Sequence, residues 1–113
     1  ETEISRDELV KRLEAATGSR VHVCAAGPSV CRKIGIMTGG AGSEVATVAK
    51  NGIDTFITGE GPHWSYTLAE ELGINLLYGG HYATETFGVK ALSAHIESKF
   101  GIPWQFVDHP TGL

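Results

Sequence analysis

Three segments of the sequence end on the same Gly-Ile step, at Gly52, Gly73 and Gly101, and a short apolar run follows each step. Hydrophobic residues recur at helical spacing ahead of each glycine, and glycine is the residue that most often terminates a helix. The runs at 54–58, 75–78 and 104–107 have the length and composition of buried strands. Strands that alternate with helices pair in parallel through right-handed crossovers, so the pattern predicts an α/β fold with a mainly parallel sheet flanked by helices.

The N-terminal part of the sequence adds a helix and two further strands. Ser5 and Glu8 form a Ser-x-x-Glu capping box, a stripe of Leu9, Val10 and Leu13 follows, and Gly18 ends the helix. The runs VHVCA and KIGIMT, at 21–25 and 33–38, are predicted strands. The whole chain of 113 residues fits one α/β domain, 1–113. Its first residues read like the opening of a unit inside a longer protein.

Composition excludes several classes of protein. The net charge is −4 and no basic run occurs, so the electrostatic signature of a nucleic-acid binder is missing. No apolar stretch approaches the roughly 20 residues of a membrane helix. Cys24 and Cys31 do not form a disulfide framework or a zinc knuckle at their spacing. We interpret them as reduced, partly buried thiols of a cytoplasmic protein.

The residues that follow the predicted strands are rich in glycine and polar side chains. In open parallel sheets, ligands bind beyond the carboxyl ends of the strands. All of these ends should meet at one rim of the sheet: Thr38-Gly39-Gly40, Thr58-Gly59-Glu60, Gly79-Gly80-His81 and Asp108-His109. This convergence is the main indication of a functional site.

His81 and Glu85 are the leading candidates for chemistry at this rim. The last helix carries a predicted core-facing stripe of Val89, Leu92, Ile96 and Phe100, and Glu85 extends that stripe by one turn. An imidazole and a carboxylate that converge there suit a divalent metal such as Zn, Fe or Mn. The alternative is that Glu85 merely caps the helix while His81 is a hydrogen-bonded turn residue. Spacing alone favours this alternative.

The other polar residues near the rim have weaker support. Glu60 is predicted to face the substrate or to support a metal ligand, whereas His63 and His109 fit solvated positions equally well. Trp64, Leu68 and Leu72 form a predicted core stripe. The segment TGGAGSE lacks the lysine of a phosphate-binding loop, so a tight turn is the preferred interpretation.

Two stretches, residues 30–60 and 79–96, closely resemble the C-terminal half of the GTP cyclohydrolase 1 type 2 family, also called Ngg-one-interacting-factor-three-like or dinuclear-metal-centre proteins. The matching motifs are Thr38-Gly39-Gly40, Ile57-Thr58-Gly59-Glu60 and Gly80-His81-Tyr82-Ala83-Thr84-Glu85. The resemblance implies one lobe of a duplicated two-lobe fold, a homo-oligomer, and two metal ions per complete site. It also implies that His81 and Glu85 are metal ligands. The family's other ligands have no counterpart in this chain.

Two functions follow as hypotheses from the residues and the resemblance together. The first is a metal-dependent hydrolase acting on a nucleotide or a phosphorylated small molecule, in which His81 and Glu85 hold a metal and Glu60 is the catalytic residue that orients water or substrate. The second is a non-catalytic metal-binding or regulatory module whose partners are proteins. Missing first-lobe ligands favour the second hypothesis for this chain alone.

Overall fold

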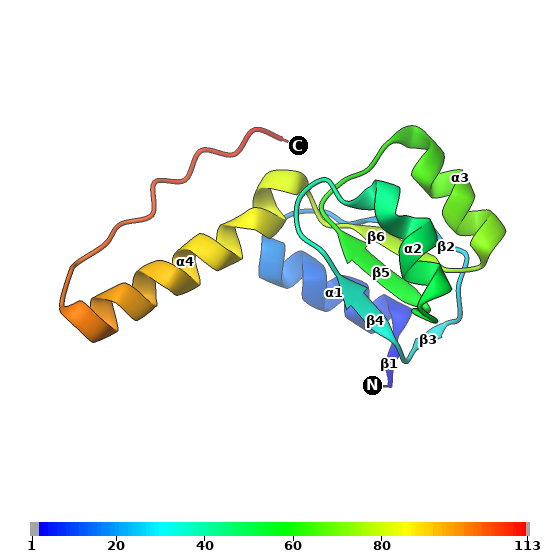
Figure 1. Cartoon of the computed structure of the whole chain (residues 1–113), viewed down its shortest axis with the longest axis horizontal. Helices are drawn as coiled ribbons and strands as arrows, with labels where there is room; N and C mark the ends of the chain where they lie inside the picture. Colours follow the sequence, from blue (N-terminus) through cyan, green and yellow to red (C-terminus); the bar gives the residue numbers. More distant parts are fainter. Residues whose placement is uncertain (1–2, 113) are drawn as a thin grey trace.

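The centre of the protein is a four-stranded sheet with the order β2-β6-β5-β4. The computed structural model describes residues 3–112. The inner strands β5 (Thr55–Thr58) and β6 (Asn75–Tyr78) are parallel to each other and to β4 (Ile34–Ile36), while β2 (His22–Ala25) pairs with β6 in the antiparallel direction. The predicted α/β fold with a mainly parallel sheet is confirmed (Figure 1).

Helices cover both faces of this sheet. Successive residues of a strand point to opposite sides, and the apolar residues of β5 and β6 therefore form a cluster on each face. Phe56 and Leu76 lie in a cluster with residues of α2 (Val45–Lys50) and α3 (His63–Leu72). Ile57 and Leu77 belong to a second cluster, against which α1 (Arg6–Thr17) packs its apolar stripe. Figure 1 shows α1 on one side of the strands and α2 with α3 on the other. The three layers hold β5 and β6 in an almost fully buried position.

The predicted helix between Ser5 and Gly18 is also confirmed. The Ser5 hydroxyl accepts a hydrogen bond from the Glu8 backbone N–H at 3.2 Å, and Gly18 ends α1 in the left-handed conformation. A two-stranded antiparallel ribbon, β1 (Ile4–Ser5) with β3 (Val30–Cys31), was not predicted, because two residues are too short to show a strand pattern. A short 3₁₀ turn, η1 (Gly42–Glu44), precedes α2. The tight turn expected in this segment is therefore present.

The strand expected at 104–107 is absent, and that prediction is wrong. Helix α4 (His81–Phe100) has 20 residues and so carries the chain about 30 Å away from the sheet before Gly101 ends it. The segment 101–112 then runs back beside α4, where the Trp104 indole N–H donates to Glu97 and Lys90 lies over the Phe106 ring. Apolar composition alone does not make a strand when no sheet edge is within reach.

The predicted core stripe of α4 is wrong as well. Val89, Leu92 and Phe100 are 54%, 59% and 63% exposed, and within α4 the described buried residue is Thr84. The start of α4, up to Glu85, contacts the body of the protein, and the rest of the helix projects from it as an arm (Figure 1). In α3, Leu68 packs against the core, but Trp64 and Leu72 lie largely exposed.

No helix within residues 3–112 is both long enough and apolar enough to cross a membrane.

The contrast between the sheet and the arm gives a test with matched substitutions. Leu76→Ala should lower the free energy of unfolding by about 2–5 kcal/mol, because Leu76 is completely buried. Leu92→Ala removes the same atoms from an exposed site and should change this free energy by about 0.5 kcal/mol or less. Denaturant titration of both variants measures the difference, and equal losses would contradict the described packing of α4.

Candidate metal centre

His81 is the first residue of α4 and follows β6 through Gly79 and Gly80. Gly80 has φ +92°, a conformation that glycine adopts without strain and that turns the chain sharply from strand to helix. Beside β6, strand β5 ends at Thr58 and continues into Gly59 and Glu60. The register pairs Thr58 with Tyr78, so Glu60 and His81 leave the sheet side by side. The predicted convergence of these two strand ends is confirmed.

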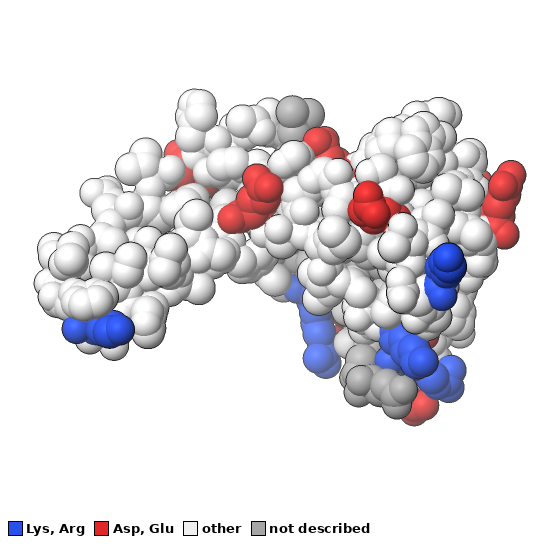
Figure 2. Space-filling view, viewed as in Figure 1, with Lys and Arg blue, Asp and Glu red and all other residues white. Residues whose placement is uncertain are grey.

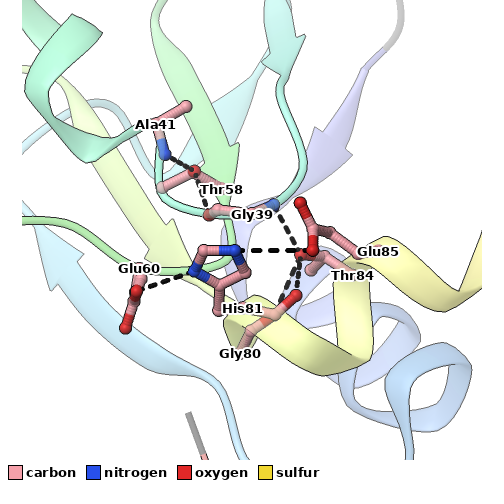
Figure 3. A network of polar contacts seen from close by, with 8 residues as sticks. All are labelled: Gly39, Ala41, Thr58, Glu60, Gly80, His81, Thr84 and Glu85. Atoms are coloured by element: carbon pink, nitrogen blue, oxygen red, sulfur yellow. Dashed lines mark hydrogen bonds and ion pairs between the residues drawn. The ribbon is translucent and has the colours of Figure 1, made fainter.

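The His81 ring lies between two carboxylates (Figure 3). Its Nδ1 atom is 2.7 Å from Glu60 Oε1, and its Nε2 atom is 3.4 Å from Glu85 Oε2. The second contact follows from helix geometry, because residues four apart share one face of a helix. When Nδ1 carries the proton and donates it to Glu60, the Nε2 lone pair of a neutral ring faces Glu85.

The same contacts shift the protonation of His81. The hydrogen bond to Glu60 is the main cause that raises the pKa of His81, and the charge of Glu85 adds to it, while burial acts in the opposite direction. A proton on Nε2 competes with any metal for the same lone pair. The carboxylates therefore have two effects: they fix the ring orientation and they hold a proton on the ring more firmly in the absence of metal.

The loop after β4 approaches this group so closely that only glycine fits at residue 39. A Cβ atom on Gly39 would lie 2.6 Å from Glu85 Oε1 and 3.2 Å from His81 Nε2, and the backbone has φ +69°. Gly59 is equally constrained, since its Cβ would lie 2.7 Å from the Cα atom of His81. These glycines let three backbone segments meet around the imidazole.

Two threonines that the sequence analysis did not single out hold the loop in place. The Gly39 N–H donates to Thr84 Oγ1 at 3.0 Å, and the Thr84 hydroxyl donates to the Gly80 carbonyl at 2.9 Å. From β5, the Thr58 hydroxyl donates to the Gly39 carbonyl at 3.2 Å (Figure 3). Thr84 lies between His81 and Glu85 on the buried side of α4, and this position was the one signal that pointed to it.

The donor atoms fit a divalent ion. A metal with bonds of about 2.0–2.2 Å holds adjacent ligand atoms roughly 3.0–3.5 Å apart, and Nε2 and Oε2 are 3.4 Å apart. A nitrogen with a carboxylate oxygen is a donor set that zinc, iron and manganese accept. The side chains of His81 and Glu85 are 37% and 57% exposed, so the pair is open to solvent. In the part of the chain that the structure describes, no three His, Cys, Asp or Glu residues converge on one such point.

The remaining candidate residues lie around this pair without joining it. His63 begins α3 and, with Glu60, lines a cavity of about 430 Å³. His109 is held near the start of α4, where its backbone N–H donates to the Tyr82 hydroxyl at 2.8 Å, and it lines a second hollow with Glu85. Glu60 contacts His81 directly, which gives it a positioning role; its predicted role toward water or substrate stays a prediction. Cys24 and Cys31 are buried and free, as expected.

Comparison with known proteins places this arrangement in a family. The model of Duf34/NIF3 (NGG1p interacting factor 3) matches residues 1–111. The "GTP cyclohydrolase 1 type 2 homolog" of Deinococcus radiodurans is 40% identical over 111 residues, which are 98% of this chain and 42% of that protein. The homolog of the same name from Halobacterium salinarum is 39% identical over 112 residues, 96% of this chain and 44% of that protein.

The solved structures agree with the sequence comparison. TTHA1606 from Thermus thermophilus is 39% identical and superposes with a TM-score of 0.89 over 99% of this chain and 45% of its own. A protein described as "ybgI, unknown function" is 32% identical, with a TM-score of 0.90 over 97% of this chain and 45% of its own. The chain thus spans less than half the length of these relatives.

Proposed function

This chain belongs to the Duf34/NIF3 (NGG1p interacting factor 3) family, and from that membership and the geometry of His81 we propose that it contributes part of the centre of a metal-dependent hydrolase. His81 and Glu85 are the proposed ligands, and zinc, iron or manganese are the proposed ions, two in a complete site. The observation that carries the proposal is the orientation of His81: Glu60 accepts from Nδ1, and Nε2 faces Glu85 at 3.4 Å.

Each residue has a distinct part in this proposal. Glu60 holds the imidazole so that Nε2 is the free nitrogen, as carboxylates do for many metal-bound histidines. Glu85 supplies an anionic oxygen, which borderline and hard cations prefer. Gly39 leaves the space that both side chains fill. Divalent ions, when bound, supply Lewis acidity and activate water for hydrolysis near neutral pH.

The proposed substrate is a nucleotide or another phosphorylated small molecule. The names of relatives such as the homolog from Deinococcus radiodurans, which refer to GTP cyclohydrolase, support this class. Two protein ligands do not complete the coordination of two ions, so a complete centre needs further ligands besides His81 and Glu85. That incompleteness supports a second candidate, a non-catalytic metal-binding or regulatory module. Turnover of GTP or a phosphoester with added manganese, zinc or iron distinguishes the two.

We also propose that the chain self-associates through its arm, with a second copy of the chain as the partner. The arm consists of the part of α4 beyond Glu85 together with residues 101–112, and its exposed apolar side chains include Val89, Leu92, Phe100 and Val107. Figure 2 shows the arm as largely free of charged side chains on this face. Apolar surface of this kind is a common basis of homo-oligomer contacts.

Substitution of Glu85 separates a ligand from a helix cap. Glu85→Gln keeps the shape of the side chain but removes the anionic oxygen, so zinc affinity should fall at least about tenfold. The melting temperature of the metal-free protein should change little, because Glu85 is largely exposed. Calorimetric titration with zinc measures the affinity. His81→Ala should abolish the same binding, whereas His63→Ala should leave it unchanged.

An unchanged zinc affinity in Glu85→Gln would show that the carboxylate only caps α4. An unchanged metal content in His81→Ala would remove the basis of the proposed centre.

The proposed self-association predicts a mass above that of the monomer. Light scattering coupled to gel filtration should give this mass at high protein concentration, and Leu92→Lys should shift it toward the monomer because it places a charge on the exposed apolar face. Leu72→Lys, on the exposed side of α3, is the matched control and should have no effect. A clean monomer for the unsubstituted chain would contradict the proposal.

A further inference from the structure

A cavity with aromatic walls shares Glu60 with the candidate metal centre. Its volume is about 430 Å³, within the range of about 300–1,000 Å³ that small-molecule sites occupy. Strands β2 and β6 contribute His22 and Tyr78, α3 contributes Tyr66 and Thr67, and the loop from Glu60 to His63 closes the remaining side. The proposed metal ligands are not part of this lining.

Three aromatic rings of the cavity wall lie close together. The centroid of the His22 ring is 5.6 Å from that of Tyr66 and 5.8 Å from that of Tyr78, with interplanar angles of 37° and 33°. Aromatic rings attract one another at such distances, so His22 joins the rings of Tyr66 and Tyr78 into one tilted aromatic cluster. Flat rings that lie close together in this way provide surface for stacking a further planar group.

Hydrogen bonds fix one wall firmly. The Ser65 hydroxyl donates to the Pro62 carbonyl at 2.6 Å, so it accepts from the Tyr78 hydroxyl at 2.7 Å. Ser65 is completely buried. Burial is the main cause that raises the pKa of Tyr78, which keeps the phenol neutral. The Tyr78 ring is therefore tied to the loop that follows Glu60, and the wall exists before any ligand arrives.

Glu60, one of the polar residues of the lining, is a hydrogen-bond acceptor. Glu60 Oε1 accepts from His81 Nδ1, but an ionised carboxylate has about four lone-pair positions and two oxygens. Glu60 thus retains capacity for a hydrogen bond from the cavity side while it holds His81. A ring with an N–H donor in its plane would satisfy this carboxylate and the aromatic walls together, which an aliphatic or phosphate group would not.

We propose that this cavity binds a planar heteroaromatic ring, which packs against Tyr66 and Tyr78 and donates an N–H hydrogen bond to Glu60. The ring would lie next to the residue that orients His81. That this ring belongs to the substrate rests on the proposed hydrolase function, whereas binding of the ring to the cavity requires no metal. Ring recognition and metal binding thus meet at Glu60.

Benzimidazole is a suitable probe, because it is planar, neutral at pH 7.5 and carries one N–H. We expect titration of the ¹⁵N-labelled chain in the presence of EDTA to shift the backbone amides of His22, residues 60–61, residues 63–67 and Tyr78. Loss of a stacking ring in Tyr66→Ala should raise the dissociation constant about tenfold. Trp64→Ala is the matched control, since Trp64 lies on the same helix but does not line the cavity, and it should bind like the parent.

1-Methylbenzimidazole tests the hydrogen bond, because it keeps the ring and lacks the N–H. On the parent chain, 1-methylbenzimidazole should bind at least about fivefold more weakly than benzimidazole. On Glu60→Ala, the two compounds should bind with about the same affinity. If Tyr66→Ala does not fold, His22→Ala replaces it, since His22 is exposed and its loss should also weaken binding about fivefold.

Benzimidazole-induced amide shifts confined to residues outside the cavity would overturn the inference. Equal affinity of benzimidazole and 1-methylbenzimidazole for the parent chain would also overturn it. Zinc binding without benzimidazole binding would overturn it and leave the proposed hydrolase centre intact. Benzimidazole binding in a chain that binds no zinc would overturn the proposed centre and leave the ring site standing.

Discussion

The parallel pairing of β5 with β6 is the contact on which the candidate site depends. Thr58 lies opposite Tyr78 in the register, so the two strands release their chains at the same edge of the sheet. Glu60 and His81 follow within two and three residues, and the 2.7 Å hydrogen bond between them joins the two strand ends. A shift of this register by one residue would turn every side chain of one strand to the opposite face. Core packing and site geometry are thus set by one pairing.

The site is held by backbone and hydroxyl groups more than by its charged residues. The Thr84 hydroxyl accepts from the Gly39 N–H, and the Thr58 hydroxyl donates to the Gly39 carbonyl. Gly39 itself lies against the side chains of Glu85 and His81. A buried N–H without a partner costs about 1–3 kcal/mol, so the Thr84 hydroxyl stabilises the loop by accepting from the Gly39 N–H. This hydrogen bond does not use the donor atoms of His81 and Glu85. His81 and Glu85 stay solvent-accessible on a rigid support. Such rigidity favours ligands that need a fixed position, and metals are the clearest case.

The sequence predicted those parts of the fold that follow from local pattern. Gly18, Gly73 and Gly101 end helices as expected, and the strands at Thr55–Thr58 and Asn75–Tyr78 lie where the apolar runs placed them. Residues 104–107 look like a strand by the same criterion, but α4 carries them away from the sheet, and only the three-dimensional path of the chain reveals this. Val89 and Leu92 were assigned to the core for a related reason, because an apolar stripe on a helix does not by itself place that face against the rest of the chain.

The site was predictable in its location and only partly in its contacts. The strand-end rule brought Glu60 and His81 to one edge, and helical spacing placed Glu85 beside His81. The hydrogen bond from His81 Nδ1 to Glu60 required the strand register, which no local pattern gives. Thr84 was named only as a member of the Gly80–Glu85 motif, because threonine in a helix has no distinctive signal of its own. The aromatic cavity joins His22 of β2 to residues of α3 and β6, and β2 lies far from both in the sequence.

In the proposed centre, Glu60 holds the Nδ1 proton of His81 and thereby leaves Nε2 as the ligand atom. A long-range ¹H–¹⁵N correlation spectrum of the metal-free chain, recorded above the pKa of His81, reports which ring nitrogen is protonated. We predict the Nδ1–H tautomer for His81, a selective shift of its Nε2 resonance on addition of zinc, and loss of the tautomer preference in Glu60→Ala. An Nε2–H tautomer, or a zinc-induced shift confined to other histidines, would contradict the account.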